Sequence, residues 1–311
     1  MQRLLVLAVI GLLAELVDGS LGMAYGVTIT SLLVATGLAP VLASASVHSA
    51  EVVTTMAAAV SHWRLGNTNA RLISGLVLPG AVGAFCGALF LASVPGGTIK
   101  PFVSGYLLLL GFFILARFAR GSRVSANEPP RRPLTRPWLA LLGLVAGFFD
   151  ASGGGGWGPI ATTTLLARRE APPNQVIGSV DASEMVVTIA ATLGFLFSMG
   201  LKGVNPWWVL ALIVGGVIAA PIAAWLVRRI PTHLLGILVA GVILFTNART
   251  LLGATGAPPA AVAPAYGALG GLWALVLAYR LATGRRTKRP TPPGGAGACD
   301  HAGPAAPADQ G

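Results

Sequence analysis

The sequence is poor in charged residues and has almost no cysteine. Charged side chains make up only 10% of its 311 residues, hydrophobic ones make up 54%, and the mean hydropathy is +0.76. A soluble domain of this length has a much more charged surface, so the composition predicts a polytopic integral membrane protein. The two cysteines, Cys86 and Cys299, lie far apart in sequence and offer neither a disulfide framework nor a C-x-x-C redox site.

The signatures of the common enzyme and nucleic-acid-binding classes are also missing. The sequence contains no Ser/His/Asp nucleophile signature, no P-loop and no dinucleotide fingerprint, so we expect no enzyme activity and no cofactor. The chain has 21 basic and 10 acidic residues and a net charge of +11. Its basic residues lie between apolar segments and do not alternate with aromatic ones, which argues against a nucleic-acid partner. They are interpreted as topology signals.

What the sequence does contain is a long internal repeat. The segment G-L-L-A-E-L-V-D-G-S-L-G-M-A-Y-G begins at Gly11, and G-L-V-A-G-F-F-D-A-S-G-G-G-G-W-G begins 132 positions later at Gly143. The same offset pairs Pro40 with Pro172, and after a one-residue slip Glu51 is anchored against Glu184. Later glycines and prolines correspond at a spacing of 136. A repeat of this length in apolar sequence is typical of a duplicated membrane transporter.

Two of the nine apolar stretches are too long for one membrane crossing. Seven stretches fit a single helix of about 20 residues. The stretches at 4–36 and 137–167 are longer, and Asp and Gly interrupt each near its middle. Each half would be a helical arm of about fourteen residues, spanning only about 21 Å. We therefore predict a re-entrant helical hairpin at the start of each repeat.

The distribution of basic residues supports the hairpins. If both broken segments return to the side from which they entered, 17 of the 21 basic residues fall on one side of the membrane, whereas a topology in which both cross divides them almost evenly. Because cytoplasmic loops concentrate Lys and Arg, this predicts an outside N-terminus and a cytoplasmic C-terminus. Each repeat then has one hairpin and three crossings, an odd number that inverts the second copy relative to the first.

The predicted fold is thus an all-α polytopic membrane protein with an inverted repeat. The first membrane half is expected at 1–118 and the second at 137–252, with a basic cytoplasmic linker at 119–136 between them. An additional transmembrane helix is expected at 253–284 and a disordered, Pro- and Gly-rich cytoplasmic tail at 285–311.

Acidic residues in apolar segments are the first candidates for function. A carboxylate at membrane depth costs at least a few kcal/mol, so such residues are interpreted as functional. The six are Glu15, Asp18, Glu51, Asp150, Asp181 and Glu184. For Asp18 and Asp150 there is a simpler alternative, compatible with function, in which each caps the second arm of its hairpin.

The glycine-rich tips are the second candidate feature. Glycines permit a tight turn and leave backbone N–H groups bare at the start of the next arm, which makes an anion site. The predicted substrate-binding residues are Ser20, Leu21, Gly22, Ser152, Gly153, Gly154 and Gly155. The alternative is that these glycines only allow close helix packing.

A third feature follows each broken segment. His48 precedes Glu51 by three positions, and Asp181 precedes Glu184 by three, so each pair lies on one helical face. With one histidine, no cysteine and no H-E-x-x-H motif, this set does not indicate a zinc site, and no metal is expected. His48 is interpreted either as a proton relay or as a buried neutral histidine. The predicted proton-coupling residues are Asp18, Asp150, Glu51, Glu184, His48 and Asp181.

These motifs together resemble the sulfite exporter TauE/SafE family of membrane permeases. The resemblance rests on D-G-S-L-G-M-A-Y-G and D-A-S-G-G-G-G-W-G-P, each followed by a proline and by S-V-H-S-A-E or S-V-D-A-S-E, and it covers residues 5–252. It implies export of sulfite or organosulfonates across a bacterial inner membrane. This sequence departs from the family pattern in its first repeat, where S-L-G-M-A-Y replaces a denser glycine run.

The residues and the resemblance together predict a proton-coupled transporter of small anions. Several acids near an anion would repel it unless some are protonated, which points to protons as the coupling ion. A cation or metal permease that uses the same carboxylates is the alternative, and an intramembrane enzyme is a weaker one. The expected partners are the anion, protons and the lipid bilayer, and the sequence leaves open whether the chain forms a homo-oligomer.

Overall fold

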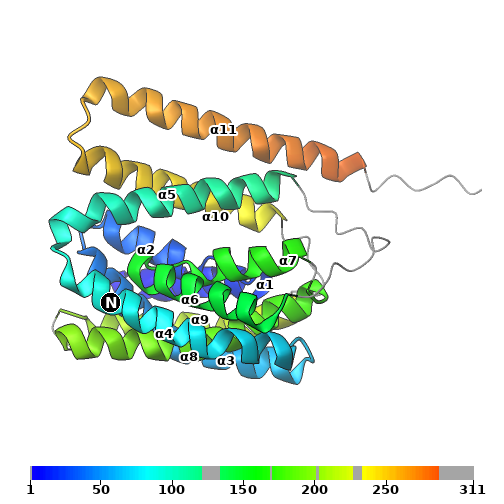
Figure 1. The fold of residues 1–311 in the computed structure, drawn as a ribbon. Helices are drawn as coiled ribbons and strands as arrows, with labels where there is room; N and C mark the ends of the chain where they lie inside the picture. Colours follow the sequence, from blue (N-terminus) through cyan, green and yellow to red (C-terminus); the bar gives the residue numbers. More distant parts are fainter. Residues whose placement is uncertain (1, 121–133, 169, 201–202, 227–232, 287–311) are drawn as a thin grey trace, which may run out of the picture.

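The computed structural model describes residues 2–120, 134–168, 170–200, 203–226 and 233–286. Within those residues every regular element is a helix, and the helices lie side by side as a bundle (Figure 1). The all-α fold predicted from the sequence is therefore confirmed. Most of the predicted basic linker and nearly all of the predicted disordered tail lie outside the described residues.

The first half of the chain forms five helices. They are α1 (Gln2–Leu21), α2 (Tyr25–Ala35), α3 (Pro40–Arg64), α4 (Ala70–Ser93) and α5 (Gly96–Arg120). The second half repeats this order, with a π-helical turn, η1, at the start of the second arm. Its elements are α6 (Arg136–Gly153), η1 (Gly158–Thr162), α7 (Thr163–Arg168), α8 (Pro173–Met199), α9 (Pro206–Leu226) and α10 (His233–Ala254), and α11 (Pro259–Arg286) follows.

In the part of the chain that the structure describes, seven helices are long and apolar enough to cross a membrane, namely α1, α4, α5, α8, α9, α10 and α11. A multi-pass membrane protein is therefore confirmed. Helix α3, which was predicted as a crossing, has 25 residues but is not among the seven. The reason is its polar face, which includes the buried Ser44, His48, Glu51 and Thr54. This face points into the protein instead of toward lipid.

Both predicted breaks are present, but the predicted length of about fourteen residues for each arm was wrong. Helices α1 and α6 have 20 and 18 residues, whereas α2 has only 11. Each first arm continues past its aspartate because the helix ends only where the backbone must adopt a positive φ. That point is Gly22 (φ 66°) in the first copy and Gly154 (φ 74°) in the second.

The two halves pack on each other in equivalent ways. Helix α4 packs against α6 and α8, and its counterpart α9 packs against α1 and α3. A Cβ atom at Gly143 would lie 2.7 Å from the carbonyl oxygen of Leu76, and one at Gly11 would lie 2.8 Å from that of Leu212. These residues are repeat partners, at offsets of 132 and 136. The same glycine-to-backbone contact is thus made twice, once by each half.

One predicted pairing needs correction. Helix α3 begins at Pro40 and α8 begins at Pro173, both at the first helical turn. The partner of Pro40 is therefore Pro173 and not Pro172. The one-residue slip between the copies thus precedes α8.

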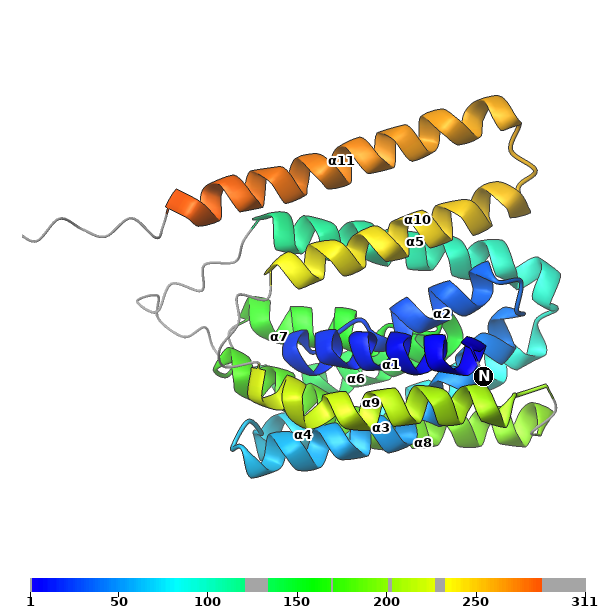
Figure 2. The same cartoon turned by 180° about the vertical axis from the view of Figure 1, so that it is seen from behind.

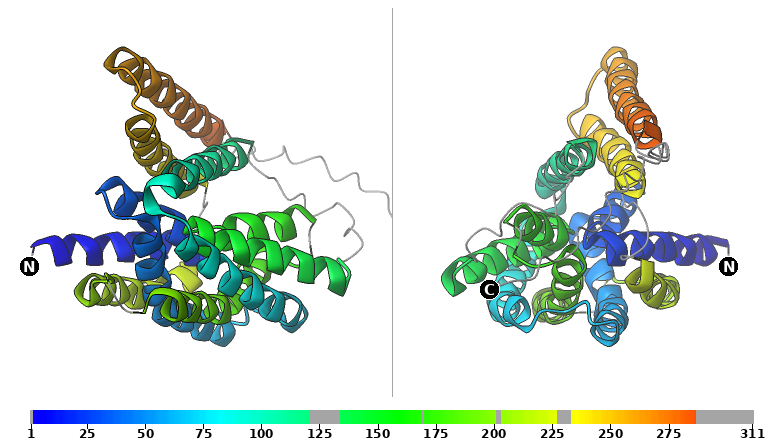
Figure 3. Two further views of the ribbon diagram at one scale, coloured as in Figure 1. Left: turned by 60° about the vertical axis from the view of Figure 1, so that its left-hand side comes forward. Right: turned by 90° about the vertical axis from the view of Figure 1, so that its right-hand side faces the viewer.

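Helix α11 stands apart from the repeat. It lies at the edge of the bundle and contacts α10 and α5 (Figures 1 and 3). None of its most apolar window is buried in the protein. Most of its apolar side chains are therefore available to lipid, whereas Trp273 packs against α10 and donates to the carbonyl of Ile237 at 2.8 Å.

Candidate functional site

Each aspartate of the broken helices binds the start of the second arm. The Asp18 Oδ1 atom accepts a hydrogen bond from the backbone N–H of Tyr25 at 3.1 Å, and the Asp150 Oδ1 atom accepts one from that of Trp157 at 3.0 Å. Tyr25 and Trp157 are repeat partners. The structure thus shows the capping role that the sequence offered as an alternative for both aspartates.

The second tip is the more completely bonded one. The N–H groups of Gly154 and Gly155 donate to the backbone carbonyl of Asp150 at 2.8 and 3.0 Å. The N–H of Gly156 donates to the Asp150 carboxylate at 2.7 Å. With Trp157, four consecutive N–H groups are thus occupied by Asp150. The N–H groups of Gly154 and Gly155, which were predicted to bind an anion, thus bond to the Asp150 carbonyl, and the carboxylate accepts from the two residues that follow.

The serines of the tips are also engaged. The hydroxyl of Ser20 donates to the carbonyl of Leu16, and that of Ser152 donates to the carbonyl of Phe148 at 2.6 Å. Both bonds stay within one helix, four residues back. In this conformation neither hydroxyl proton is directed at a ligand.

The two tips lie against each other's repeat. The hydroxyl of Thr162 donates to the carbonyl of Gly22 at 2.6 Å. A Cβ atom at Gly155 would collide with the backbone nitrogen of Val27, and one at Gly154 would collide with the Thr30 side chain. The predicted packing role of the glycines is therefore present in the structure, whatever else they do.

The predicted proton-coupling residues gather in two buried clusters. We call His48, Glu51 and Asp150 the first cluster, and Asp18, Asp181 and Glu184 the second cluster. All six side chains belong to residues that are buried. Under the repeat, His48 corresponds to Asp181, Glu51 to Glu184 and Asp150 to Asp18. Each cluster therefore combines the aspartate of one repeat with the two residues, three positions apart, of the other repeat.

The first cluster contains a histidine that contacts both of its carboxylates. The His48 Nε2 atom lies 3.2 Å from Asp150 Oδ2 and 3.9 Å from Glu51 Oε2. The His48 Nδ1 atom lies 2.8 Å from the carbonyl oxygen of Ser44, which can only accept, so Nδ1 carries a hydrogen. The contact between Nε2 and Asp150 then needs one further proton, held by either residue.

The second cluster contains three carboxylates and no histidine of its own. One oxygen from each of Asp18, Asp181 and Glu184 lies within 4.8 Å of the others. His62, at the far end of α3, approaches it with Nε2 at 3.2 Å from Asp181 Oδ2. The Asn67 amide lies 3.2 Å from His62 Nδ1 and can donate to it, which would leave the ring hydrogen on Nε2, the nitrogen nearer Asp181.

Sequence reasoning missed two residues of this site. His62 lies fourteen residues after His48, close to four helical turns, so helical periodicity on α3 could have found it. Trp157 gave no such signal. Its fully buried indole donates to the carbonyl of Val180 at 3.1 Å and fixes the second tip to α8.

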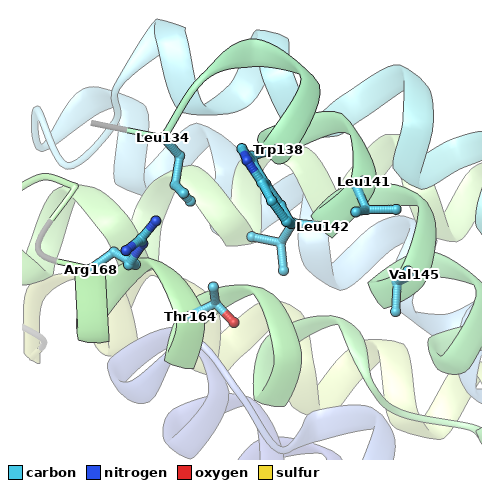
Figure 4. Close-up of a pocket in the computed structure, with 7 residues that line it drawn as sticks. All are labelled: Leu134, Trp138, Leu141, Leu142, Val145, Thr164 and Arg168. Atoms are coloured by element: carbon cyan, nitrogen blue, oxygen red, sulfur yellow. The ribbon is translucent and has the colours of Figure 1, made fainter. Parts of the chain in front are cut away.

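A cavity of about 330 Å³ lies between α6 and α7, away from the clusters. Figure 4 shows Trp138, Leu141 and Val145 on its α6 side and Thr164 and Arg168 on its α7 side. The three α6 side chains are 59%, 47% and 38% exposed. In a membrane protein such exposed apolar side chains face lipid, so this cavity opens to the bilayer.

The sequence is similar to those of known membrane transporters. Residues 7–250 match the family model described as Sulfite exporter TauE/SafE. The chain is 51% identical over 273 residues to the Probable membrane transporter protein YtnM of Bacillus subtilis (strain 168), covering 88% of this chain and 91% of that protein. It is 25% identical over 146 residues to the Probable membrane transporter protein YdhB of the same organism, covering 46% and 58%.

No solved structure matches the chain. The family match confirms the resemblance that the repeated motifs indicated. It extends from α1 into the last turns of α10 and leaves α11 outside. The chain therefore belongs to the sulfite exporter TauE/SafE family of membrane transporters.

Proposed function

We propose that the protein is a proton-coupled secondary transporter that exports small anions such as sulfite or organosulfonates. The observation that carries this proposal is the second tip, where the Asp150 carboxylate occupies backbone N–H groups while its other oxygen faces His48. Backbone N–H groups at the start of a helical segment are suited to an oxyanion. In this proposal the Asp150 carboxylate occupies the N–H groups that the transported anion would bind.

Proton coupling follows from this competition. A proton that moves onto Asp150 removes its negative charge and weakens its hold on the N–H groups of Gly156 and Trp157. A charge-assisted hydrogen bond is worth roughly 1.5–3 kcal/mol. Protonation of Asp150 therefore favours replacement of its carboxyl group by the transported anion at these N–H groups. Proton binding and anion binding therefore support each other at one site.

The membrane topology proposed with this function is the inverted one. In Figures 1 and 2, α2 turns back toward the end of the bundle where the N-terminus lies. This supports a re-entrant hairpin of α1 with α2, and the equivalent packing of the two halves supports its inverted copy at α6 and α7. With 17 of the 21 basic residues on the opposite side, we assign the N-terminus to the outside and the C-terminus to the cytoplasm.

Single cysteines test this topology in a background without Cys86 and Cys299. If α1 and α2 form a hairpin, Gln2→Cys and Thr36→Cys react with a membrane-impermeant maleimide from the outside only. Thr135→Cys and Pro172→Cys react from the cytoplasmic side only. Labelling of positions 2 and 36 from opposite sides would show that the first broken segment crosses the membrane.

Transport itself is tested in proteoliposomes that contain the purified protein. Because proton and anion binding support each other, sulfite flux is expected to rise severalfold under a proton gradient imposed in the same direction as the flux. Glu51→Gln and Glu184→Gln should abolish this acceleration, because each removes a buried carboxylate from a cluster. Glu170→Gln is the control, because that acid lies between α7 and α8 and pairs with Arg71 at 3.6 Å. Sulfite flux unaffected by any proton gradient would refute the coupling.

The second cluster favours one alternative, a cation permease. Three carboxylates within 4.8 Å form an all-oxygen set of the kind that hard cations bind. The same proteoliposomes distinguish the two functions. Flux of a labelled divalent cation that Asp181→Asn abolishes, without any sulfite flux, would establish the alternative.

A further inference from the structure

A second cavity lies at the outer ends of α2, α5 and α10. Its volume is about 360 Å³, and it is lined by Ala35, Gly97, Lys100, Arg249 and Thr250, among others. All three helix ends lie at the end of the bundle that holds the N-terminus (Figure 2). This is the end proposed above to face outward.

The cavity is positively charged. Lys100 and Arg249 contribute two cations, and its lining contains no acidic residue. Only four of the 21 basic residues are assigned to the outer side, so half of them line this one cavity. Lys100 also lies in the first turns of α5, a 25-residue helix, where the helix dipole adds to the positive potential. These features suit an oxyanion.

A layer of buried polar side chains lies one helical turn below the cavity. Ser104 follows Lys100 by four residues on α5, and Asn247 precedes Thr250 by three on α10. On α2, Ser31 precedes Ala35 by four, and its hydroxyl accepts a hydrogen bond from the Asn247 amide at 2.6 Å. Each of the three helices thus continues inward from the cavity with a polar residue.

Two atoms of this layer lack hydrogen-bond partners. The Ser104 hydroxyl and the Asn247 Oδ1 atom are buried and bond to nothing in the described part of the chain. On α2 the same is true of the Thr30 hydroxyl, next to Ser31. Thr30 packs on Gly154, and the Tyr106 hydroxyl donates to the Gly155 carbonyl at 3.4 Å. Because unpaired buried polar groups are costly, such a row indicates a path for a polar ligand.

We propose that the transported oxyanion passes between α2, α5 and α10, and that Lys100 and Arg249 form its binding site at the outer mouth. This inference rests on the proposed function and adds the path that the anion takes through the protein. The named residues of the route are basic or neutral, whereas the two acidic clusters are built from α1, α3, α6 and α8. Proton and anion therefore use different helices and meet at the second tip, where Asp150 adjoins Gly154 and Gly155.

The sidedness of transport tests the mouth. In right-side-out proteoliposomes, Lys100→Gln and Arg249→Gln are each expected to raise the half-saturating concentration of external sulfite by about tenfold to hundredfold, the loss of one charge-assisted hydrogen bond. The half-saturating concentration of internal sulfite should change little. Arg3→Gln is the control, because Arg3 is an exposed cation on the same side but outside the cavity. An unchanged external value in the double variant overturns the inference.

A negative charge in the polar layer tests the route below the mouth. Asn247→Asp keeps the size and the acceptor of the side chain but repels an anion, so sulfite flux should fall at least tenfold. Thr246→Asp on α10, where the residue is partly exposed, is the matched control for the added charge. Equal flux in Asn247→Asp and the unsubstituted protein would exclude this route.

An anionic lipid headgroup has the same chemistry as the oxyanion, and lipid composition separates the two. In vesicles of pure phosphatidylcholine, the defect of the Lys100→Gln, Arg249→Gln protein is expected to persist. A defect that appears only with phosphatidylglycerol would assign the cavity to lipid and overturn the inference.

Binding distinguishes failure of this inference from failure of the proposed function. Calorimetric titration of the purified protein with sulfite needs no transport. Weaker sulfite binding in the double variant supports the mouth even if no proton coupling is found. Equal binding, or no binding to the unsubstituted protein, overturns it.

Discussion

Replacing Gly155 with alanine should prevent the protein from accumulating as a stable, monodisperse species. Gly155 has a φ of 147°, a backbone conformation nearly restricted to glycine and costing about 1–3 kcal/mol for another residue. Its new Cβ atom would also collide with the backbone nitrogen of Val27, and overpacking of this kind costs about 1–3 kcal/mol. Together these terms reach a large part of the stability of an ordinary domain, about 5–15 kcal/mol.

Two control substitutions separate the backbone effect from the collision. Gly37 has a φ of 99°, but a Cβ atom added there would have no neighbouring atom within 4 Å, so Gly37→Ala should show only the backbone cost. Gly105→Ala has neither penalty and should be as stable as the unsubstituted protein. The yield of monodisperse protein in detergent ranks the three, together with the thermal unfolding of each variant that can be purified. If Gly155→Ala were no less stable than Gly37→Ala, the second tip would not pack against α2 as described.

The first tip should tolerate alanine better than the second. A Cβ atom at Gly22 would lie 2.9 Å from the Thr162 hydroxyl oxygen, at the end of a side chain, whereas at Gly155 it meets backbone. This difference corresponds to the sparser glycine content of the first copy. It gives a physical reason for the asymmetry between S-L-G-M-A-Y and S-G-G-G-G-W in the sequence.

The positions of the helix breaks and of the buried acids could be predicted because the membrane penalises both strongly. A glycine next to an aspartate in an apolar stretch indicates a break in the helix. The same pattern at the matched position of a repeat makes that interpretation stronger. The lengths of the arms could not be predicted, because α1 and α6 continue through Asp18 and Asp150. An aspartate does not itself end a helix, and from within the first arm its carboxylate can still accept hydrogen bonds from the second arm.

The sequence also could not predict that the aspartate of each repeat contacts side chains of the other repeat. The repeat pairs Asp18 with Asp150, but it does not reveal that Asp150 contacts His48 of the other half. Such contacts depend on how α6 packs between α4 and its neighbours, which involves residues far apart in sequence. Helical periodicity places His62 on the same face of α3 as His48, but its contact with Asp181 appears only when α3 and α8 lie side by side.

Removing the carboxylate of Asp150 should destabilise the protein strongly and, at the same time, strengthen its response to sulfite. Asp150→Ala leaves the N–H groups of Gly156 and Trp157 unpaired and takes away the partner of His48. Breaking a buried ionic pair from one side costs about 3–5 kcal/mol. Asp150→Asn keeps an oxygen acceptor for the two N–H groups, so its loss of stability should be smaller.

Sulfite should restore part of this stability if an anion and the Asp150 carboxylate compete for the same N–H groups. A ligand at 100 times its dissociation constant stabilises a protein by about 2.7 kcal/mol. The rise in the unfolding temperature on adding sulfite should therefore be larger for Asp150→Ala and Asp150→Asn than for the unsubstituted protein. Asp18→Asn is the matched control, because its carboxylate accepts from one N–H group, that of Tyr25. A sulfite response that is the same in all four proteins would mean that the second tip does not bind the anion, and the glycines there would serve packing alone.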